Sequence, residues 1–159
     1  MLAPAMGTES QALNGCELRE LHAAATVLES LAVKQAPPFG SAAIERLREA
    51  NRSLRLAAGD PAAVAKAEQD FHRELTARCD NARLLAILAR VRRALAGPQA
   101  RSAAAPARTW LCAEQHDAII RALERSGHAS ASRRVRTHLM GELPELLAAL
   151  EPRRDAHPA

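Results

Sequence analysis

The chain has 159 residues, 48% of them hydrophobic and 2% aromatic, with three cysteines and a formal net charge of +4. This length and apolar content suit one domain whose core needs no disulfide, and three widely spaced cysteines outside any CxxC pair indicate a reducing, cytoplasmic environment. The arginines are interleaved with Ala and Leu as on solvated helix faces, and no segment is apolar enough to span a bilayer, which argues against nucleic-acid binding by this chain and against a membrane protein.

The composition predicts an all-α fold, because Ala, Leu, Arg and Glu favour helices and strand-forming aromatic residues are scarce. We expect a flexible leader over residues 1–16, one helical domain over 17–150 and a tail over 151–159. Apolar residues recurring at helical spacing predict a first helix over about 17–35, which the prolines from Pro37 onward end.

Cap residues mark the next two helices. Ser41 can cap a second helix that ends before Gly59. Asp60 and Pro61 form a strong start signal, because an N-cap residue is followed by proline at the first helical position. A third helix is therefore predicted over about 62–78.

Three further helices complete an antiparallel bundle of about six. A wide apolar face predicts a fourth helix over about 84–95, closed by Gly97 and Pro98. Residues 99–108 have the composition of a mobile loop.

The last two helices are predicted over about 109–126 and from about residue 129. Pro144 lies inside the second of them, and proline lacks the N–H that continues a helix. We therefore expect a kink near Met140.

Four side chains on three of these helices form a candidate metal site. Glu68 and His72 are four residues apart, so they lie on one helix face about a turn from each other. His116 and His138 fall within or beside the apolar stripes of the fifth and sixth helices and should point inward. Neutral imidazole suits Zn, Ni, Cu and Fe, and the added carboxylate broadens this list toward Mn, so the residue types alone do not choose a metal; Zn or Ni is our first expectation and Mn is possible.

The alternative is that these histidines are core-edge residues satisfied by hydrogen bonds, which is the better interpretation for any one of them alone. Burying three unpaired imidazoles together would be costly, so spacing alone leaves the two interpretations balanced. Of the other histidines, His22 borders the first apolar stripe, whereas His128 and His157 are expected at the surface.

Several short motifs follow one another in an order that resembles a known family. They are Gly59-Asp60-Pro61, Glu68-Gln-Asp-Phe71-His72-Arg-Glu-Leu75, Asp80-Asn81, Glu114-Gln-His116-Asp-Ala-Ile119 and Arg136-Thr-His138-Leu139. Over roughly residues 17–150 the chain resembles the FCD domain, the C-terminal effector-sensing domain of the FadR subfamily of GntR-type bacterial transcription regulators.

The resemblance implies a helical bundle that holds a divalent metal through three histidines and an Asp or Asn, with a small organic acid bound at or above the ion. The histidines that match are His72, His116 and His138. Glu68 stands where the family usually has Asp or Asn, so the resemblance implies Glu68 as the fourth ligand, with Asp70, on a different helical face, as a poorer substitute.

The first helix departs from the family, which often has an inward arginine there for the carboxylate of the effector. Ala25 aligns with that arginine. Of the residues at the edges of neighbouring stripes, Arg92 and His22 are our candidates for binding the ligand instead.

Regulators of this type also carry a winged helix-turn-helix before the sensing domain. Residues 1–16 are too short to hold one, so this chain is expected to sense an organic acid as a homodimer and to reach DNA only through a module that it lacks.

Two other functions remain open. A metal-dependent hydrolase would use the open site to activate water, but Asp70, the nearest spare carboxylate, points about 160° away from His72 around an ideal helix and leaves no evident general base. A metal-free helical module would dimerise through apolar stripes on the first and fourth helices.

Overall fold

The computed structural model describes residues 13–102 and 106–150, and within them the chain forms six α-helices and no strand. The helices are α1 (Gly15–Gln35), α2 (Ser41–Leu56), α3 (Pro61–Thr76), α4 (Ala82–Ser102), α5 (Pro106–Arg125) and α6 (His128–Ala148). The predicted all-α bundle is confirmed. The predicted tail, residues 151–159, and most of the predicted leader lie outside the described residues, but Gly15 and Cys16 belong to α1.

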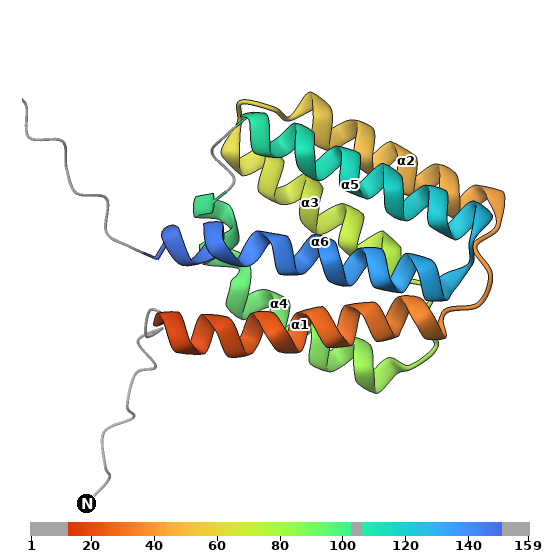
Figure 1. The fold of residues 1–159 in the computed structure, drawn as a ribbon, viewed down its shortest axis with the longest axis horizontal. Helices are drawn as coiled ribbons and strands as arrows, with labels where there is room; N and C mark the ends of the chain where they lie inside the picture. The colour runs from red at the N-terminus through yellow and green to blue at the C-terminus, as the bar shows by residue number, and fades with distance from the viewer. Residues whose placement is uncertain (1–12, 103–105, 151–159) are drawn as a thin grey trace, which may run out of the picture.

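The six helices form a ring around the core. α1 packs on α6, α6 on α5, α5 on α2, α2 on α3, α3 on α4, and α4 returns to α1. Figure 1 shows α1 and α6 antiparallel and side by side, with the first and last described residues at one end of the bundle. Contacts of α4 with α6 and of α1 with α3 cross the ring, so α1, α3, α4 and α6 enclose one part of the interior.

Local signals explain how the helices begin. Asn14 caps α1 in a capping box, in which its side chain accepts a hydrogen bond from the backbone N–H of Glu17 and the Glu17 carboxylate accepts one from Asn14. Asp60 caps α3, with Pro61 at its first position as predicted. Gly127, with φ of 79°, supplies the left-handed conformation needed before α6.

The predicted end of the fourth helix was wrong. α4 continues through Gly97 and Pro98, and α5 begins earlier than predicted, so most of the expected loop over 99–108 is helical. Only residues 103–105 of that loop lie outside the described part of the chain. Pro98 is buried against the bundle, and the Ala and Arg residues that follow favour helix, so packing and propensity outweigh the two breakers.

The second internal proline does not end its helix either, because α6 continues past Pro144 to Ala148. None of the helices that the structure describes is long and apolar enough to cross a membrane.

Candidate metal centre and adjoining pocket

Three imidazoles from three helices meet in the interior of the bundle. His72 on α3, His116 on α5 and His138 on α6 are 8%, 0% and 2% exposed. Nε2 of His138 lies 3.2 Å from Nε2 of His72 and 3.3 Å from Nε2 of His116. The predicted inward orientation of His116 and His138 is therefore confirmed, and one nitrogen from each of the three rings lies within 4.8 Å of the other two.

A different side chain holds the outer nitrogen, Nδ1, of each imidazole. The pairs are His72 with Glu29, His116 with Asn51 (3.2 Å) and His138 with Gln115 (2.7 Å). The Asn51 amide nitrogen donates to the carbonyl oxygen of Ala113 and to Asp117, so its oxygen faces His116 and accepts. With a proton on each Nδ1, the neutral imidazoles direct three Nε2 lone pairs at one another.

Phe71 fixes the plane of one of these rings. Its phenyl ring is fully buried and stacks on His116, with centroids 3.7 Å apart and planes 4° from parallel. Phe71 also belongs to the main apolar cluster of the bundle, so the position of His116 is set by the core itself.

Glu29 links His72 on α3 to Arg92 on α4. One of its oxygens accepts from Nδ1 of His72, and the other accepts from Nη2 of Arg92 at 2.7 Å. Arg92 also donates to the carbonyl oxygen of His72 at 3.0 Å and to the hydroxyl of Thr76 at 3.3 Å. These contacts join α1, α3 and α4 around one carboxylate.

Three more donor residues form a second layer, each one helical turn from a histidine. They are Glu68 before His72, Cys112 before His116 and Glu142 after His138, each four positions away. Sγ of Cys112 is 3.6 Å from Nε2 of His116, and Oε1 of Glu142 is 3.7 Å from Nε2 of His138. Burial, together with the neighbouring Glu68 and Glu142 carboxylates, raises the pKa of the Cys112 thiol.

The guanidinium of Arg108 forms ion pairs with both carboxylates of this layer and with a third on α6. Nη1 of Arg108 lies 3.5 Å from Oε1 of Glu68, Nη2 lies 3.5 Å from Oε1 of Glu142, and Nε pairs with Glu145. Three carboxylates thus share one positive charge. Oε1 of Glu68 is buried and makes no hydrogen bond with any residue that the structure describes.

Burial and neighbouring charges separate the pKa values of the three imidazoles. Burial and the other imidazoles hold the pKa of His116 well below 6.5, and burial together with His72 lowers that of His138 to about 3. Burial also disfavours the His72 cation, but the Glu29 carboxylate outweighs it and raises the pKa of His72. His116 and His138 are therefore neutral at neutral pH, the form that binds metals.

Burial has the opposite effect on the second-layer carboxyls. It raises the pKa of Glu68, and the neighbouring Glu142 raises it further. Burial likewise raises the pKa of Glu142, against the influence of His72 and Arg108. A divalent cation beside these carboxylates would relieve this penalty.

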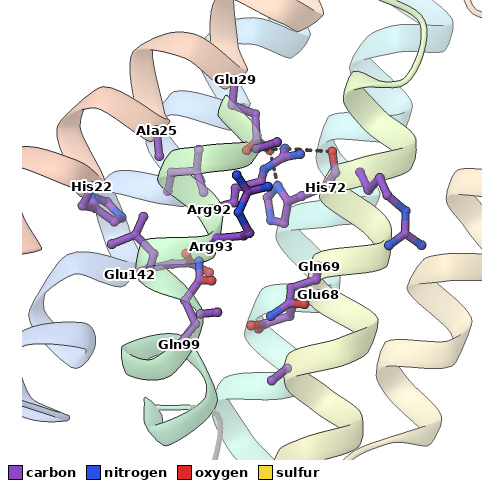
Figure 2. A pocket seen from close by; sticks show the side chains of 16 residues that line it. His22, Ala25, Glu29, Glu68, Gln69, His72, Arg92, Arg93, Gln99 and Glu142 are labelled. Atoms are coloured by element: carbon purple, nitrogen blue, oxygen red, sulfur yellow. Dashed lines mark hydrogen bonds and ion pairs between the residues drawn. The ribbon is translucent and has the colours of Figure 1, made fainter. Parts of the chain in front are cut away.

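A cavity of about 450 Å³ adjoins the histidines, within the usual size range of small-molecule pockets. Its walls come from α1, α3, α4 and α6. Figure 2 shows Glu68 and Gln69 from α3 on one side of this space and His22 from α1 on the other, with Arg92 and Arg93 between them. Glu29 from α1 reaches His72 at one end of the space. The cavity thus reaches His72 and Glu68.

Both residues that the sequence analysis suggested for ligand binding line this cavity. His22 is buried, and its Nε2 has no hydrogen-bond partner among the described residues. Arg92 lines it too, but its guanidinium already binds Glu29. Ala25 lies in the same wall, so no first-helix arginine occupies that position.

The remaining residues weighed from the sequence lie elsewhere. Asp70 pairs with Lys66 and Arg73, at 2.6 Å each, and does not line the cavity, as its helical position predicted. His128 is half-buried, with Nε2 3.3 Å from the carbonyl oxygen of Pro37. His157 lies outside the described residues.

Sequence reasoning missed the side chains that surround the histidines: Glu29, Asn51, Arg108, Cys112, Gln115 and Glu142. Two signals were present. Glu29 and Asn51 are polar residues inside apolar stripes, Asn51 between Leu47 and Leu54 at helical spacing. Cys112 and Glu142 are each four residues from a candidate ligand.

A family model described as the FCD domain matches residues 20–141. No curated protein and no solved structure matches the chain.

Proposed function

The chain belongs to the FCD domain family, an effector-binding regulatory domain of GntR-type transcription regulators, and on that premise we propose that it binds a divalent metal together with a small organic acid. Binding of the acid would shift the balance between two arrangements of the bundle and thereby control a DNA-binding module outside this chain. The proposal includes a homodimer in the cytoplasm, as expected from the resemblance.

His72, His116 and His138 are the proposed histidine ligands. Two nitrogens bound to a tetrahedral zinc ion at about 2.0–2.1 Å lie about 3.3–3.4 Å apart, and the nitrogens here are 3.2 and 3.3 Å apart. These two distances match those expected for an ion such as Zn or Ni, and the nitrogens of His72 and His116 lie within 4.8 Å of each other.

Glu68 is the proposed carboxylate ligand. Three features support this role: one oxygen of Glu68 makes no hydrogen bond with any described residue, Glu68 lies one turn from His72, and it is buried beside the histidines. Glu68 is not in the group of donors that lie within 4.8 Å of one another, so its side chain has to turn toward the histidines when the ion binds. A carboxylate ligand would also admit Mn.

The organic acid is proposed to bind in the adjoining cavity, next to the ion. Of the three arginines that line the cavity, Arg92 is bound to Glu29 and Arg73 to Asp70, whereas Arg93 makes no ion pair with any described residue. We propose that Arg93 attracts the carboxylate, while Arg92 and His22 contact the ligand from the wall.

One observation carries the proposal: three Nε2 atoms converge, and each Nδ1 is anchored by a different side chain. Histidine ligands of metals usually donate their second N–H to such an acceptor, which fixes the tautomer and the ring orientation. Three imidazoles that merely filled a core would also need hydrogen-bond partners for Nδ1, but packing alone would not bring their three Nε2 atoms together.

Metal analysis and titration calorimetry test this function. Protein stripped with a chelator should bind one equivalent of Zn²⁺ or Ni²⁺, and His116→Ala should abolish the binding. If neither wild-type metal binding nor a metal-dependent response to organic acids were found, the proposal would be abandoned.

The metal-free dimerisation module remains an alternative because apolar side chains are exposed on the two helices named for it. Val27 and Leu31 on α1 are 52% and 37% exposed, and Ile87 on α4 is 52% exposed. A dimer whose melting temperature changes neither with a chelator nor with added Zn²⁺ would favour this alternative. Metal-dependent turnover that is lost with His138→Ala would instead favour a hydrolase.

A further inference from the structure

The metal-binding proposal leaves the second layer largely without a role. Of its three members, Cys112 is the one whose chemistry differs from the residues that the family resemblance implies. It lies on α5 one turn before His116, is 3% exposed, and is not oxidised to a disulfide. Its sulfur faces the histidines rather than only the apolar side chains beside it.

The distance from this sulfur to the histidines matches coordination. A tetrahedral ion with a metal–sulfur bond of about 2.3 Å and a metal–nitrogen bond of about 2.0–2.1 Å separates sulfur from nitrogen by about 3.6 Å. Sγ of Cys112 lies 3.6 Å from Nε2 of His116. Sγ also lies within 4.8 Å of a nitrogen of His138.

A second, independent observation concerns Glu68. This carboxylate is 8% exposed, has one oxygen without a hydrogen-bond partner and faces the cavity beside His72. Cys112, His138 and Glu142 each offer a donor atom within 4.8 Å of the other two. The thiol thus lies among groups that can bind a metal.

From these contacts we propose that Cys112 supplies a thiolate ligand to the ion held by His72, His116 and His138, which makes the centre selective for a thiophilic divalent metal. The inference rests on the proposed metal-binding function and goes beyond it, because it gives the tetrahedral ion a thiolate in the position proposed above for Glu68, and with it a metal preference. A thiolate favours Zn²⁺ or Co²⁺, whereas a histidine and carboxylate set alone also accepts Mn²⁺.

The binding step balances in charge and atoms. The Cys112 S–H bond breaks, its proton leaves to solvent by way of the carboxylates that line the cavity, and a sulfur–metal bond replaces one water on the incoming ion. No oxidant or reductant is required. The sulfur lies outside the group formed by the three histidine nitrogens, so small side-chain adjustments are needed for all four donors to reach one ion.

Packing alone is the competing explanation for a buried cysteine. Cys112 contacts an apolar cluster that includes Leu54, Val64 and Ala113, and a free cysteine often serves as a small apolar residue. This role predicts that Co²⁺ binds without any sulfur signature and that Cys112→Ser changes stability but not metal preference.

Cobalt spectroscopy of the whole chain distinguishes a thiolate ligand from a cysteine that only packs in the core. Wild-type protein titrated with Co²⁺ should develop a thiolate-to-cobalt charge-transfer band in the near ultraviolet together with the visible cobalt bands. Cys112→Ser should lose the near-ultraviolet band, keep visible cobalt bands from the histidines, and show a smaller preference for Zn²⁺ over Mn²⁺ than the wild type. Cys79→Ser is the matched control and should keep the near-ultraviolet band. Cys79 is also buried and free, but it packs with Ala32 and Leu84 away from the histidines.

The outcomes distinguish this inference from the proposed function. Visible cobalt bands without a charge-transfer band in the wild type would overturn the role of Cys112 and leave the histidine centre standing. No cobalt binding at all would overturn both. X-ray absorption of zinc-loaded wild-type protein tests the role without any variant: a sulfur neighbour in the first coordination shell supports it, and a shell of nitrogen and oxygen alone refutes it.

Discussion

Glu29 accepts a hydrogen bond from Nδ1 of His72 and, through its second oxygen, binds Arg92 at 2.7 Å. This carboxylate therefore orients a proposed metal ligand and also fixes one cation of the adjoining cavity. It is 2% exposed, so neither contact is replaced easily by water.

Replacing Glu29 by Gln should weaken Zn²⁺ binding by about 10- to 100-fold, the usual effect of removing a partner that orients a histidine ligand. Glutamine keeps the size of the side chain but loses the charge that favours a proton on Nδ1 of His72. Titration calorimetry against a competing chelator measures the change. Glu20→Gln, on the exposed face of the same helix, serves as the control and should bind Zn²⁺ like the wild type.

The same carboxylate should make the metal-free protein sensitive to acid. Burial disfavours ionised Glu29, but His72 and Arg92 outweigh it and lower its pKa from 4.5 to about 2. Because the folded-state pKa is depressed, its stabilisation is full above pH 4.5 and is lost as pH falls toward 2, an effect of about 3 kcal/mol. Urea unfolding of wild type and Glu29→Gln across this range should show the difference shrinking with acid; a constant difference would contradict the assignment.

Metal binding should stabilise the bundle by mass action. Free Zn²⁺ at about 100 times its dissociation constant should raise the free energy of unfolding by about 2.7 kcal/mol. Thermal melts with chelator and with Zn²⁺ measure the shift. His138→Gln should remove it, whereas His128→Gln, at the start of α6 and outside the centre, should retain it.

Removing the unpaired arginine of the cavity should weaken binding of the organic acid several-fold, with metal affinity unchanged. Arg93→Ala tests this, and Arg90→Ala is the control because it is also exposed on α4 but does not line the cavity. Calorimetry of zinc-loaded protein with a panel of small carboxylates supplies the readout. Equal weakening by both variants would indicate a general effect of net charge rather than a contact in the cavity.

The fold could be predicted because its signals are local. Apolar periodicity and caps such as Asp60 fix where helices form, and these depend on neighbours in sequence. The end of α4 could not be predicted in this way, because the burial of Pro98 against the rest of the bundle outweighs its local tendency to break a helix.

The candidate site was predictable for the inward histidines and much less so for their surroundings. His116 and His138 share helical spacing with apolar residues, which indicates an inward direction. Glu29 on α1 meets His72 on α3 because these two helices pack against each other. Local patterns in one sequence do not show which helices pack together. The clue was a charged residue in an apolar stripe, which is recognisable as a buried partner only once its neighbours are known.

The most direct test of a metal centre formed by three histidines is an anomalous-scattering map from a crystal of the protein grown with Zn²⁺. Our account predicts one strong peak at the zinc edge within bonding distance of Nε2 of His72, His116 and His138. A well-ordered map in which these three nitrogens surround no peak would contradict it.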